Sequence, residues 1–181
     1  MPRLFYVGRA SICRSRYCGG VQDPNLRVVQ EVEAEEPTAK SSPRRDVPPA
    51  YCCAILVDGQ GRLVLEVRPE SDADAPGRLT CFGGGREGDE EPLACLRREL
   101  LEEIGFVLGE ARHVLTLQTP KGPAWFYRAD GPEQGTVVAC ESGHGVRWVQ
   151  RSELFEQRLA DWHRAALVGW CAGQAEAWVG A

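Results

Sequence analysis

The sequence lacks an excess of positive charge, a long apolar run and a regular cysteine framework. Its 181 residues carry a formal net charge of −5, so a broad basic surface for nucleic acid is not expected. No apolar run reaches the roughly 20 residues that a membrane-spanning helix needs. The first residues, MPRLFYVGRASICRSRYC, place arginines where a signal peptide needs an apolar core. We therefore expect no nucleic-acid partner, no membrane partner and no signal peptide.

The eight cysteines show no regular disulfide spacing. Five lie in apolar segments, where a free cysteine often behaves as a small buried hydrophobe: Cys52, Cys53, Cys81, Cys95 and Cys171. Cys13 and Cys18 are separated by four residues and no second pair follows, whereas a structural zinc site needs four ligands. Ordinary cysteines are therefore favoured over a zinc site. Reduced thiols in the cytoplasm are the expected state.

The segment from Gly84 to Phe106 reads GGREGDEEPLACLRRELLEEIGF. Five residues separate Gly84 from Glu90, seven more separate Glu90 from the Arg-Glu-Leu run, and a Glu-Glu pair and Gly105-Phe106 follow. This spacing matches the Nudix box at every defining position, so the chain resembles the Nudix hydrolases. Members of that family cleave a pyrophosphate linkage in a nucleoside diphosphate joined to another group, with Mg²⁺ or Mn²⁺. The resemblance implies this reaction on a small-molecule nucleotide.

Apolar residues recur within the segment at helical spacing and predict an amphipathic helix: Leu93, Leu96, Leu100 and Ile104. Asp89 is expected to cap its start. Pro92 suits the first turn, and Gly105 suits the left-handed residue that ends a helix.

Three carboxylates of this helix share one face, because Glu99, Glu102 and Glu103 are spaced at i, i+3 and i+4. Like charges at these spacings repel. A solvated acidic face is one explanation, and a bound divalent cation is the better one, since Mg²⁺ takes oxygen ligands and bridges to phosphates. Glu99 and Glu103, followed by Glu102, are the predicted metal ligands. The resemblance implies that the Gly84 carbonyl is a further ligand.

Arg98 directly precedes Glu99 in the sequence and is expected to point away from the face of the three carboxylates. The resemblance implies a structural ion pair between Arg98 and Glu90. The alternative is an arginine that faces solvent.

The general base is open between a box carboxylate and a later loop residue, because Nudix enzymes differ in this respect. Glu141 is the best later candidate, since it precedes an apolar strand in a glycine-rich loop. Its alternative is an ordinary solvated carboxylate. The predicted catalytic residues are thus Glu99, Glu102, Glu103 and Glu141.

Substrate contacts are less well defined by the sequence. Trp125, Phe126, Tyr127 and Trp148 could stack on a base, and His144 could reach a phosphate. Aromatic residues in strands are more often core, and a lone loop histidine is more often exposed. The particular nucleotide and the number of metal ions stay open.

The chain divides into an N-terminal arm with a proline-rich linker, residues 1–47, and a Nudix domain, residues 48–181. Strands are predicted at 51–58, 62–69, 79–84, 113–119, 124–130, 136–141 and 145–150, and one closing helix at 152–173 with Ser152 as its cap. This order is of the α/β (α+β) class. The resemblance implies an α/β/α sandwich with a mixed sheet, here with an N-terminal extension.

The arm contains a strand-like run, LRVVQEV, with no evident partner in the domain. Unpaired strands recruit neighbours, so a homodimer is predicted. Two other functions compete with hydrolysis: a nucleotide-binding sensor and a prenyl-diphosphate isomerase. The complete set of box glutamates argues against the first, and the regular box spacing argues against the second.

Overall fold

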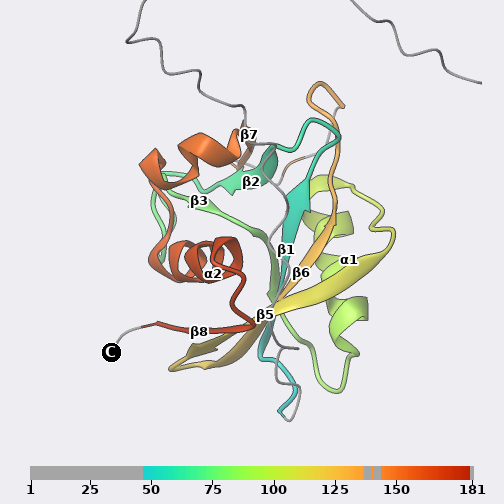
Figure 1. Ribbon diagram of the computed structural model, residues 1–181. Coiled ribbons are helices and arrows are strands. Elements are labelled where there is room, and N and C mark those ends of the chain that lie inside the picture. The colour runs from blue at the N-terminus through green and yellow to red at the C-terminus, as the bar shows by residue number, and fades with distance from the viewer. Residues whose placement is uncertain (1–46, 137–139, 141–143, 180–181) are drawn as a thin grey trace, which may run out of the picture. The chain divides into compact units, whose positions relative to one another are not determined.

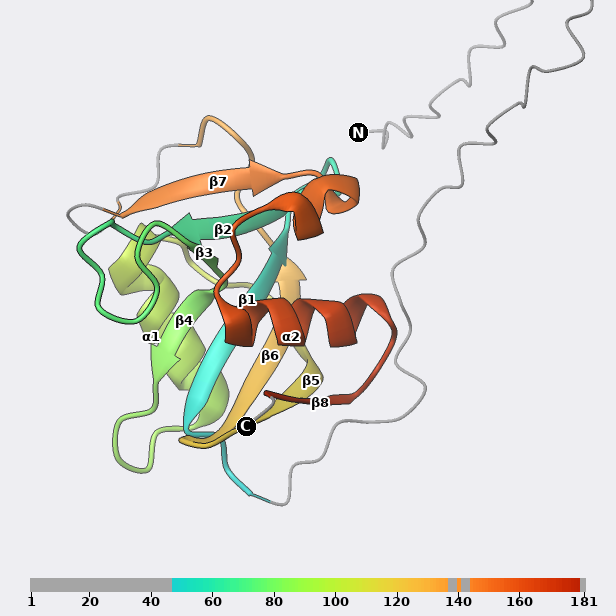
Figure 2. The ribbon, with the colours of Figure 1, turned by 90° about the vertical axis from the view of Figure 1, so that its left-hand side faces the viewer.

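The computed structural model describes residues 47–136, 140 and 144–179. The predictions for the N-terminal arm, for Cys13 and Cys18, for Glu141 and for most of the strand at 136–141 lie outside these residues. Within them, an eight-stranded mixed sheet lies between two α-helices. α1 (Pro92–Ile104) and α2 (Asp161–Cys171) cover opposite faces of the sheet (Figures 1 and 2). The predicted fold class is confirmed.

The order along the sheet is β3-β2-β1-β6-β5-β8, with β4 on β1 and β7 on β2. The strands are β1 (Tyr51–Val57), β2 (Leu63–Val67), β3 (Leu79–Thr80), β4 (Phe82–Gly85), β5 (Ala111–Thr119), β6 (Gly122–Asp130), β7 (Gly145–Val149) and β8 (Glu176–Trp178). β1 pairs in parallel with β6, and β5 with β8. The other pairs are antiparallel.

β1 is the central strand, and its apolar run YCCAILV suits burial on both faces. β4 pairs with its first half, in the register Cys53↔Gly83, while β2 pairs with its end at Leu56 and Val57. β2 and β4 therefore meet the same edge of β1 at different points. Residues from all three strands line the cavity described below.

Each face of the sheet has its own core, because successive side chains of a strand point to opposite faces. On the α1 side the core includes Cys52, Ala54, Leu56, Leu96, Leu100 and Ile104. On the α2 side it includes Cys53, Ile55, Leu115, Phe126, Leu167 and Trp170. Burial of each such leucine contributes about 1.5–3 kcal/mol. The two cores fix the helices on the sheet.

α1 follows the predicted stripe, with Leu96, Leu100 and Ile104 almost fully buried. Gly105 ends the helix with φ 62°. The predicted cap was wrong: Glu91 is the residue before the helix, and its side chain makes no capping hydrogen bond. Asp89 lies too far ahead of the first turn, where Pro92 already supplies a helical φ without an N–H to satisfy.

The single C-terminal helix predicted at 152–173 was also wrong. A 3₁₀ helix at Arg151–Glu156 is followed by an extended break before α2, so Ser152 is no helix cap. Within the break, Leu79 N–H donates to Arg158 O at 2.8 Å and Ala160 N–H to Leu79 O at 3.0 Å. These bonds hold Leu159, only 3% exposed, against β3. Pairing with the sheet thus replaces helical hydrogen bonds, and β8 beyond α2 was not predicted.

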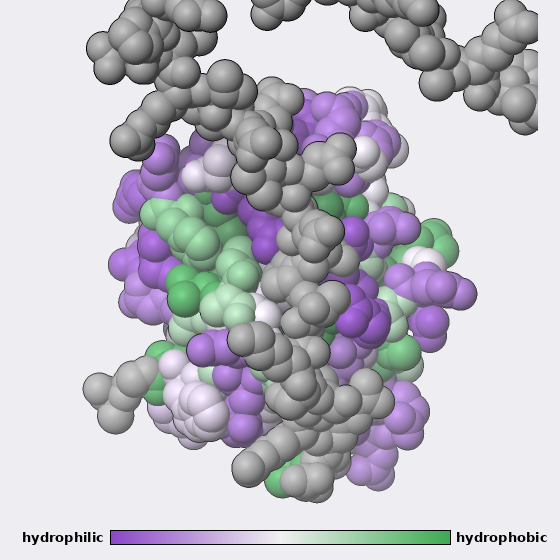
Figure 3. All heavy atoms as spheres, viewed as in Figure 1, coloured by the Kyte–Doolittle hydropathy of each residue, from purple (hydrophilic) through white to green (hydrophobic). Residues whose placement is uncertain are grey.

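Among residues 47–136, 140 and 144–179, few large apolar side chains are exposed. Over α2, hydrophobic residues reach the surface among hydrophilic ones (Figure 3), and Val168 there is exposed. None of the helices in the described ranges is long and apolar enough to cross a membrane.

Candidate active site

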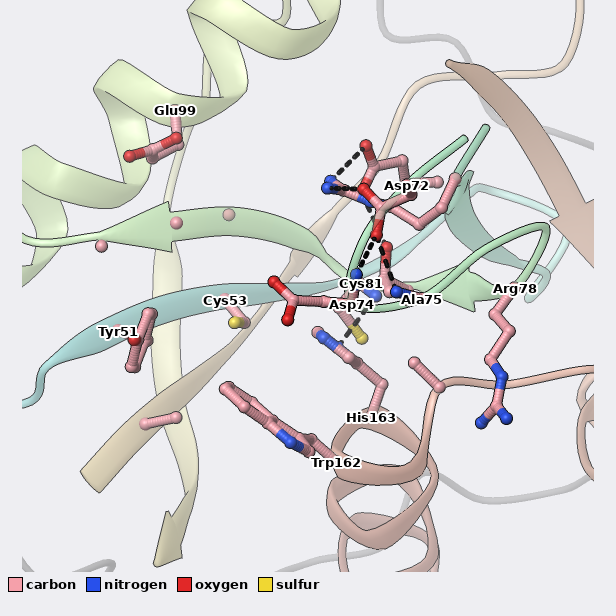
Figure 4. Close-up of a pocket in the computed structure, with 18 of the residues that line it drawn as sticks. Tyr51, Cys53, Asp72, Asp74, Ala75, Arg78, Cys81, Glu99, Trp162 and His163 are labelled. Carbon is pink, nitrogen blue, oxygen red and sulfur yellow. Dashed lines mark hydrogen bonds and ion pairs between the residues drawn. The ribbon is translucent and has the colours of Figure 1, made fainter. Parts of the chain in front are cut away.

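A cavity of about 450 Å³ lies between the sheet and the two helices. Figure 4 shows Glu99 of α1 on one side and Trp162 and His163 of α2 on the other, with Tyr51 and Cys53 of β1 between them. The cavity therefore has an acidic side and an aromatic side.

The acidic side places two box carboxylates against the glycines of β4. Gly83 N–H donates to Glu103 Oε2 at 3.0 Å. A Cβ at Gly84 would lie only 2.5 Å from the carboxylate of Glu99, so the side chain packs on bare backbone. Gly84, Glu99 and Glu103 all line the cavity.

Both carboxylates are held in surroundings that disfavour their charge. Burial raises the pKa of Glu103 to about 8, and the nearby charges of Glu66 and Glu99 raise it further, against a lowering hydrogen bond from Gly83. Burial also raises the pKa of Glu99. Acids buried close together are stabilised by a cation, so this side of the cavity suits a positive ligand.

The sequence predicted that Arg98 points away from the carboxylates, and this prediction was wrong. Its Nη1 donates to Glu99 Oε1 at 2.8 Å and to Glu102 Oε2 at 3.2 Å. Its Nε and Nη2 each donate to the carboxylate of Glu90 at 3.1 Å, which lowers the pKa of Glu90. Because a long helical side chain leans toward the N-terminus, Arg98 reaches the preceding loop and joins it to the acidic face.

Glu102 is separated from the other two carboxylates. Its side chain is 60% exposed, and it contacts Arg98 and does not line the cavity. In the part of the chain that the structure describes, no three acidic, histidine or cysteine side chains form a ready metal cage. Mg²⁺ needs one or two carboxylates besides water and substrate phosphates. Glu99, Glu103 and Gly84 fit a cation of that kind.

Glu66 is a buried carboxylate that the sequence interpretation missed. It accepts a hydrogen bond from Thr80 Oγ1 at 2.7 Å and one from Arg68 Nη1 at 3.0 Å, and Arg68 is also bound by Asp72. His144 Nδ1 contacts Glu66 as well and does not line the cavity. The sequence feature that could have identified Glu66 is its position as a charged residue inside the apolar run LVLEV.

Of the four aromatic candidates from the sequence, Phe126 lines the cavity, and Trp125, Tyr127 and Trp148 do not. Trp125 and Tyr127 are buried in the core on the α1 side and do not line the cavity. Their neighbours Ala124 and Phe126 do line it. The reason is strand alternation, which sends odd and even residues of β6 to opposite faces.

Apart from Phe126, the aromatic side of the cavity comes from residues that the sequence did not single out as substrate contacts. Tyr51 and Trp162 meet edge to face, with ring centroids 5.7 Å apart, and Lys121 Nζ lies 5.6 Å from the Trp162 ring. Cys81 N–H donates to His163 Nδ1 at 3.1 Å. A tryptophan and a histidine within a helical pattern give no sign of this role, because the break before α2 sets their direction.

The sandwich and the acidic helix facing its cavity define a Nudix-type hydrolase. The family model described as NUDIX domain matches residues 47–170, and the chain belongs to this family. Its class of activity is that of a Nudix pyrophosphohydrolase. Nudix hydrolases generally use divalent metal ions and act on small nucleotides.

Two curated relatives and one solved structure illustrate the similarity. The CMP-5'-(N-acetyl-N-hydroxy-3-aminopropyl)phosphonate hydrolase of Streptomyces rubellomurinus is 27% identical over 142 residues, 75% of this chain and 68% of that protein. The prenyl-diphosphate phosphatase of Methanosarcina mazei is 29% identical over 106 residues, 55% of this chain and 62% of that protein. The MutT NUDIX hydrolase of Burkholderia pseudomallei superposes with a TM-score of 0.57 at 24% identity, over 68% of this chain and 98% of that one. The last likeness concerns the fold alone.

Proposed function

We propose that this protein hydrolyses the diphosphate linkage of a nucleoside diphosphate joined to another group, with Mg²⁺ or Mn²⁺ as cofactor. The supporting observation is the meeting of Glu99 and Glu103 with Gly84 at one side of the cavity. The name of the Streptomyces relative, a hydrolase of a CMP-linked phosphonate, supports a nucleotide substrate. The name of the Methanosarcina relative supports a diphosphate group.

In this proposal Glu99, Glu103 and the Gly84 carbonyl hold the metal. When bound there, a divalent cation neutralises phosphate charge and lowers the pKa of bound water. Arg98 keeps Glu99 in place and connects it through Glu90 to the preceding loop. Glu102 contributes less directly, since its observed contact is with Arg98.

A substrate panel tests the reaction and its substrate class. ADP-ribose, NADH, dinucleoside polyphosphates, oxidised dNTPs, nucleotide sugars and isoprenyl diphosphates are incubated with the full chain and Mg²⁺ or EDTA, and the products are separated and identified. The proposal predicts cleavage between two phosphorus atoms of at least one nucleotide, and only with metal. Metal-independent cleavage, or cleavage of isoprenyl diphosphates alone, contradicts it.

We further propose a cytoplasmic homodimer. The support for the dimer is the strand-like run LRVVQEV in the N-terminal arm, and the support for the cytoplasm is the set of eight cysteines without regular disulfide spacing. Light scattering on the full chain and on a variant without residues 1–46 checks the dimer. A dimer that shifts toward monomer on deletion agrees with the proposal, and a monomeric full chain contradicts it.

A further inference from the structure

His163 is held in one tautomer by the backbone of the sheet. Its Nδ1 accepts the N–H of Cys81 at 3.1 Å, so in the neutral ring the proton sits on Nε2. Burial lowers the pKa of His163 to about 4; the nearby charge of Glu66 opposes this effect, and that of Arg68 adds to it. Around neutral pH the side chain therefore presents a neutral Nε2–H donor.

The Nε2–H group of His163, a residue that lines the cavity, has no protein acceptor among residues 47–136, 140 and 144–179. His163 is partly exposed, and its one hydrogen bond within those residues is through Nδ1. A donor of this kind is satisfied by water or by an acceptor on a bound molecule, and loss of that partner on binding costs free energy.

The ring of His163 contacts apolar groups, while the charged side chains of Glu66 and Arg68 lie close enough to act on it. Phe126 meets the imidazole edge to face at 5.9 Å, and Cys53 and Cys81 line the adjoining wall. Burial raises the pKa of Cys81 to about 12, so its thiol stays uncharged. Trp162 adds a large ring beside His163 (Figure 4). The rings of Phe126 and Trp162 on this side suit contact with a planar group.

We propose that His163 is the specificity-determining residue of this site, and that its Nε2–H donates a hydrogen bond to a keto oxygen or ring nitrogen of a nucleobase lying beside Trp162. This inference rests on the proposed nucleotide substrate and names the group that selects it. An isoprenoid chain has no acceptor and would leave the donor unpaired. A site that hydrogen-bonds its substrate discriminates strongly against an analogue without the partner atom.

Binding measurements distinguish the contribution of the base to affinity from that of the phosphate. Calorimetry compares each of the four ribonucleoside 5'-monophosphates with ribose 5-phosphate and with geranyl monophosphate, on the wild-type full chain with Mg²⁺. At least one nucleotide is expected to bind more than about 10-fold more tightly than ribose 5-phosphate. One hydrogen bond and one ring contact together raise affinity by about this factor.

Two variants distinguish the donor from the shape of the ring. His163→Phe keeps a planar ring without the donor and is expected to reduce the preference for the nucleotide by about 3- to 10-fold. His163→Gln can accept the Cys81 N–H through its oxygen and donate through its amide, so it is expected to retain most of the preference. Circular dichroism verifies folding of both.

A measurement on the wild-type chain keeps the inference testable if a variant does not fold. Nitrogen-15 NMR of the labelled histidines is expected to show His163 as the Nε2–H tautomer, and its Nε2 signal is expected to shift with the preferred nucleotide but not with ribose 5-phosphate. An unmoved signal, an equal preference in His163→Phe, or tighter binding of geranyl monophosphate overturns the inference. If nucleotide diphosphates are nevertheless hydrolysed with metal, the proposed function stands and only the role of His163 fails.

Discussion

The backbone N–H of Gly83 donates a hydrogen bond of 3.0 Å to Oε2 of Glu103, and so joins the end of α1 to β4. Gly83 has φ 129°, and a Cβ there would lie 2.1 Å from the carbonyl oxygen of Cys52. Only glycine fits the close approach of β4 to β1 at this point. The position of the Glu103 carboxylate is thus set by paired strands.

Gly84→Ala tests whether the contact between Gly84 and Glu99 matters for metal binding. The added Cβ would lie 2.5 Å from the Glu99 carboxylate, which must then move. We expect weaker Mg²⁺ affinity and a fall in kcat/KM of about 10-fold or more, with little change in melting temperature.

Gly85→Ala is the matched control for this change. A Cβ at Gly85 would meet only the Tyr51 ring, at 3.9 Å, an ordinary contact. Magnesium titration and steady-state kinetics on both variants decide the matter. Equal Mg²⁺ affinity and equal kcat/KM in the two variants would show that metal binding does not depend on the observed position of the Glu99 carboxylate.

Arg98→Ala removes the cation that joins Glu90, Glu99 and Glu102. We expect a fall in melting temperature on the order of 5 °C together with weaker Mg²⁺ binding. Because Arg98 lowers the pKa of Glu90, the stabilisation is present above the ordinary pKa of a glutamate and is lost as the pH falls through the lowered one. The melting temperatures of variant and wild type should therefore converge in acid.

Arg97→Ala serves as control, because this neighbouring residue of α1 is exposed. Differential scanning calorimetry on the two variants from pH 3 to pH 8 measures the effect. A stability of Arg98→Ala equal to that of Arg97→Ala, with only turnover reduced, would refute the structural role of the ion pairs.

The sequence predicted the elements whose pattern is local. The α1 stripe ending at Gly105 and the hairpin of β1 and β2 follow from periodicity and turn residues. It could not predict the break around Leu159, whose hydrogen bonds go to Leu79 far away in the chain. That break directs His163 into the cavity, so the place of His163 could not be predicted from local patterns.

The site shows the same division. The box spacing placed Glu99 and Glu103 together, since residues four apart share a helix face. The spacing could not show that Glu102 contacts Arg98 and does not line the cavity. The direction of the Arg98 side chain depends on Glu90 and on Gly85 O, which lie outside the helix. Nor could the sequence show that Trp125 faces the α1 core, because either face of β6 is apolar enough to be buried.

The lowered pKa of His163 makes folding stability depend on pH. Its pKa is lowered from 6.5 to about 4 in the folded chain, so the unfolded state binds more protons between these values. Stability contributed by the neutral ring is present above about pH 6.5 and is lost as the pH falls toward 4. Thermal denaturation from pH 4 to pH 8 should show a steeper acid loss for wild type than for His163→Gln. Parallel curves would mean that His163 titrates normally.

Glu141 stays a prediction from the sequence as general base. A metal-bound glutamate is a poor base because the cation lowers its pKa, and a second carboxylate avoids that conflict. Glu141→Gln should lower kcat by about 10²-fold with little change in KM, and should flatten the acidic limb of the pH–rate profile. Glu110→Gln, at an exposed position outside the cavity, is the control. Unchanged kcat in Glu141→Gln would return the base to Glu99 or Glu102.

The most direct test of the central claim is the Mg²⁺-dependent turnover of Glu103→Gln on the best substrate of the panel. The amide keeps the shape of the side chain and its contact with Gly83 N–H, but it removes the charge that holds the cation. We predict a loss of at least about 10²-fold in rate, with circular dichroism unchanged and with Glu91→Gln, an exposed neighbour before α1, near wild type. A folded Glu103→Gln protein with wild-type turnover would contradict the account.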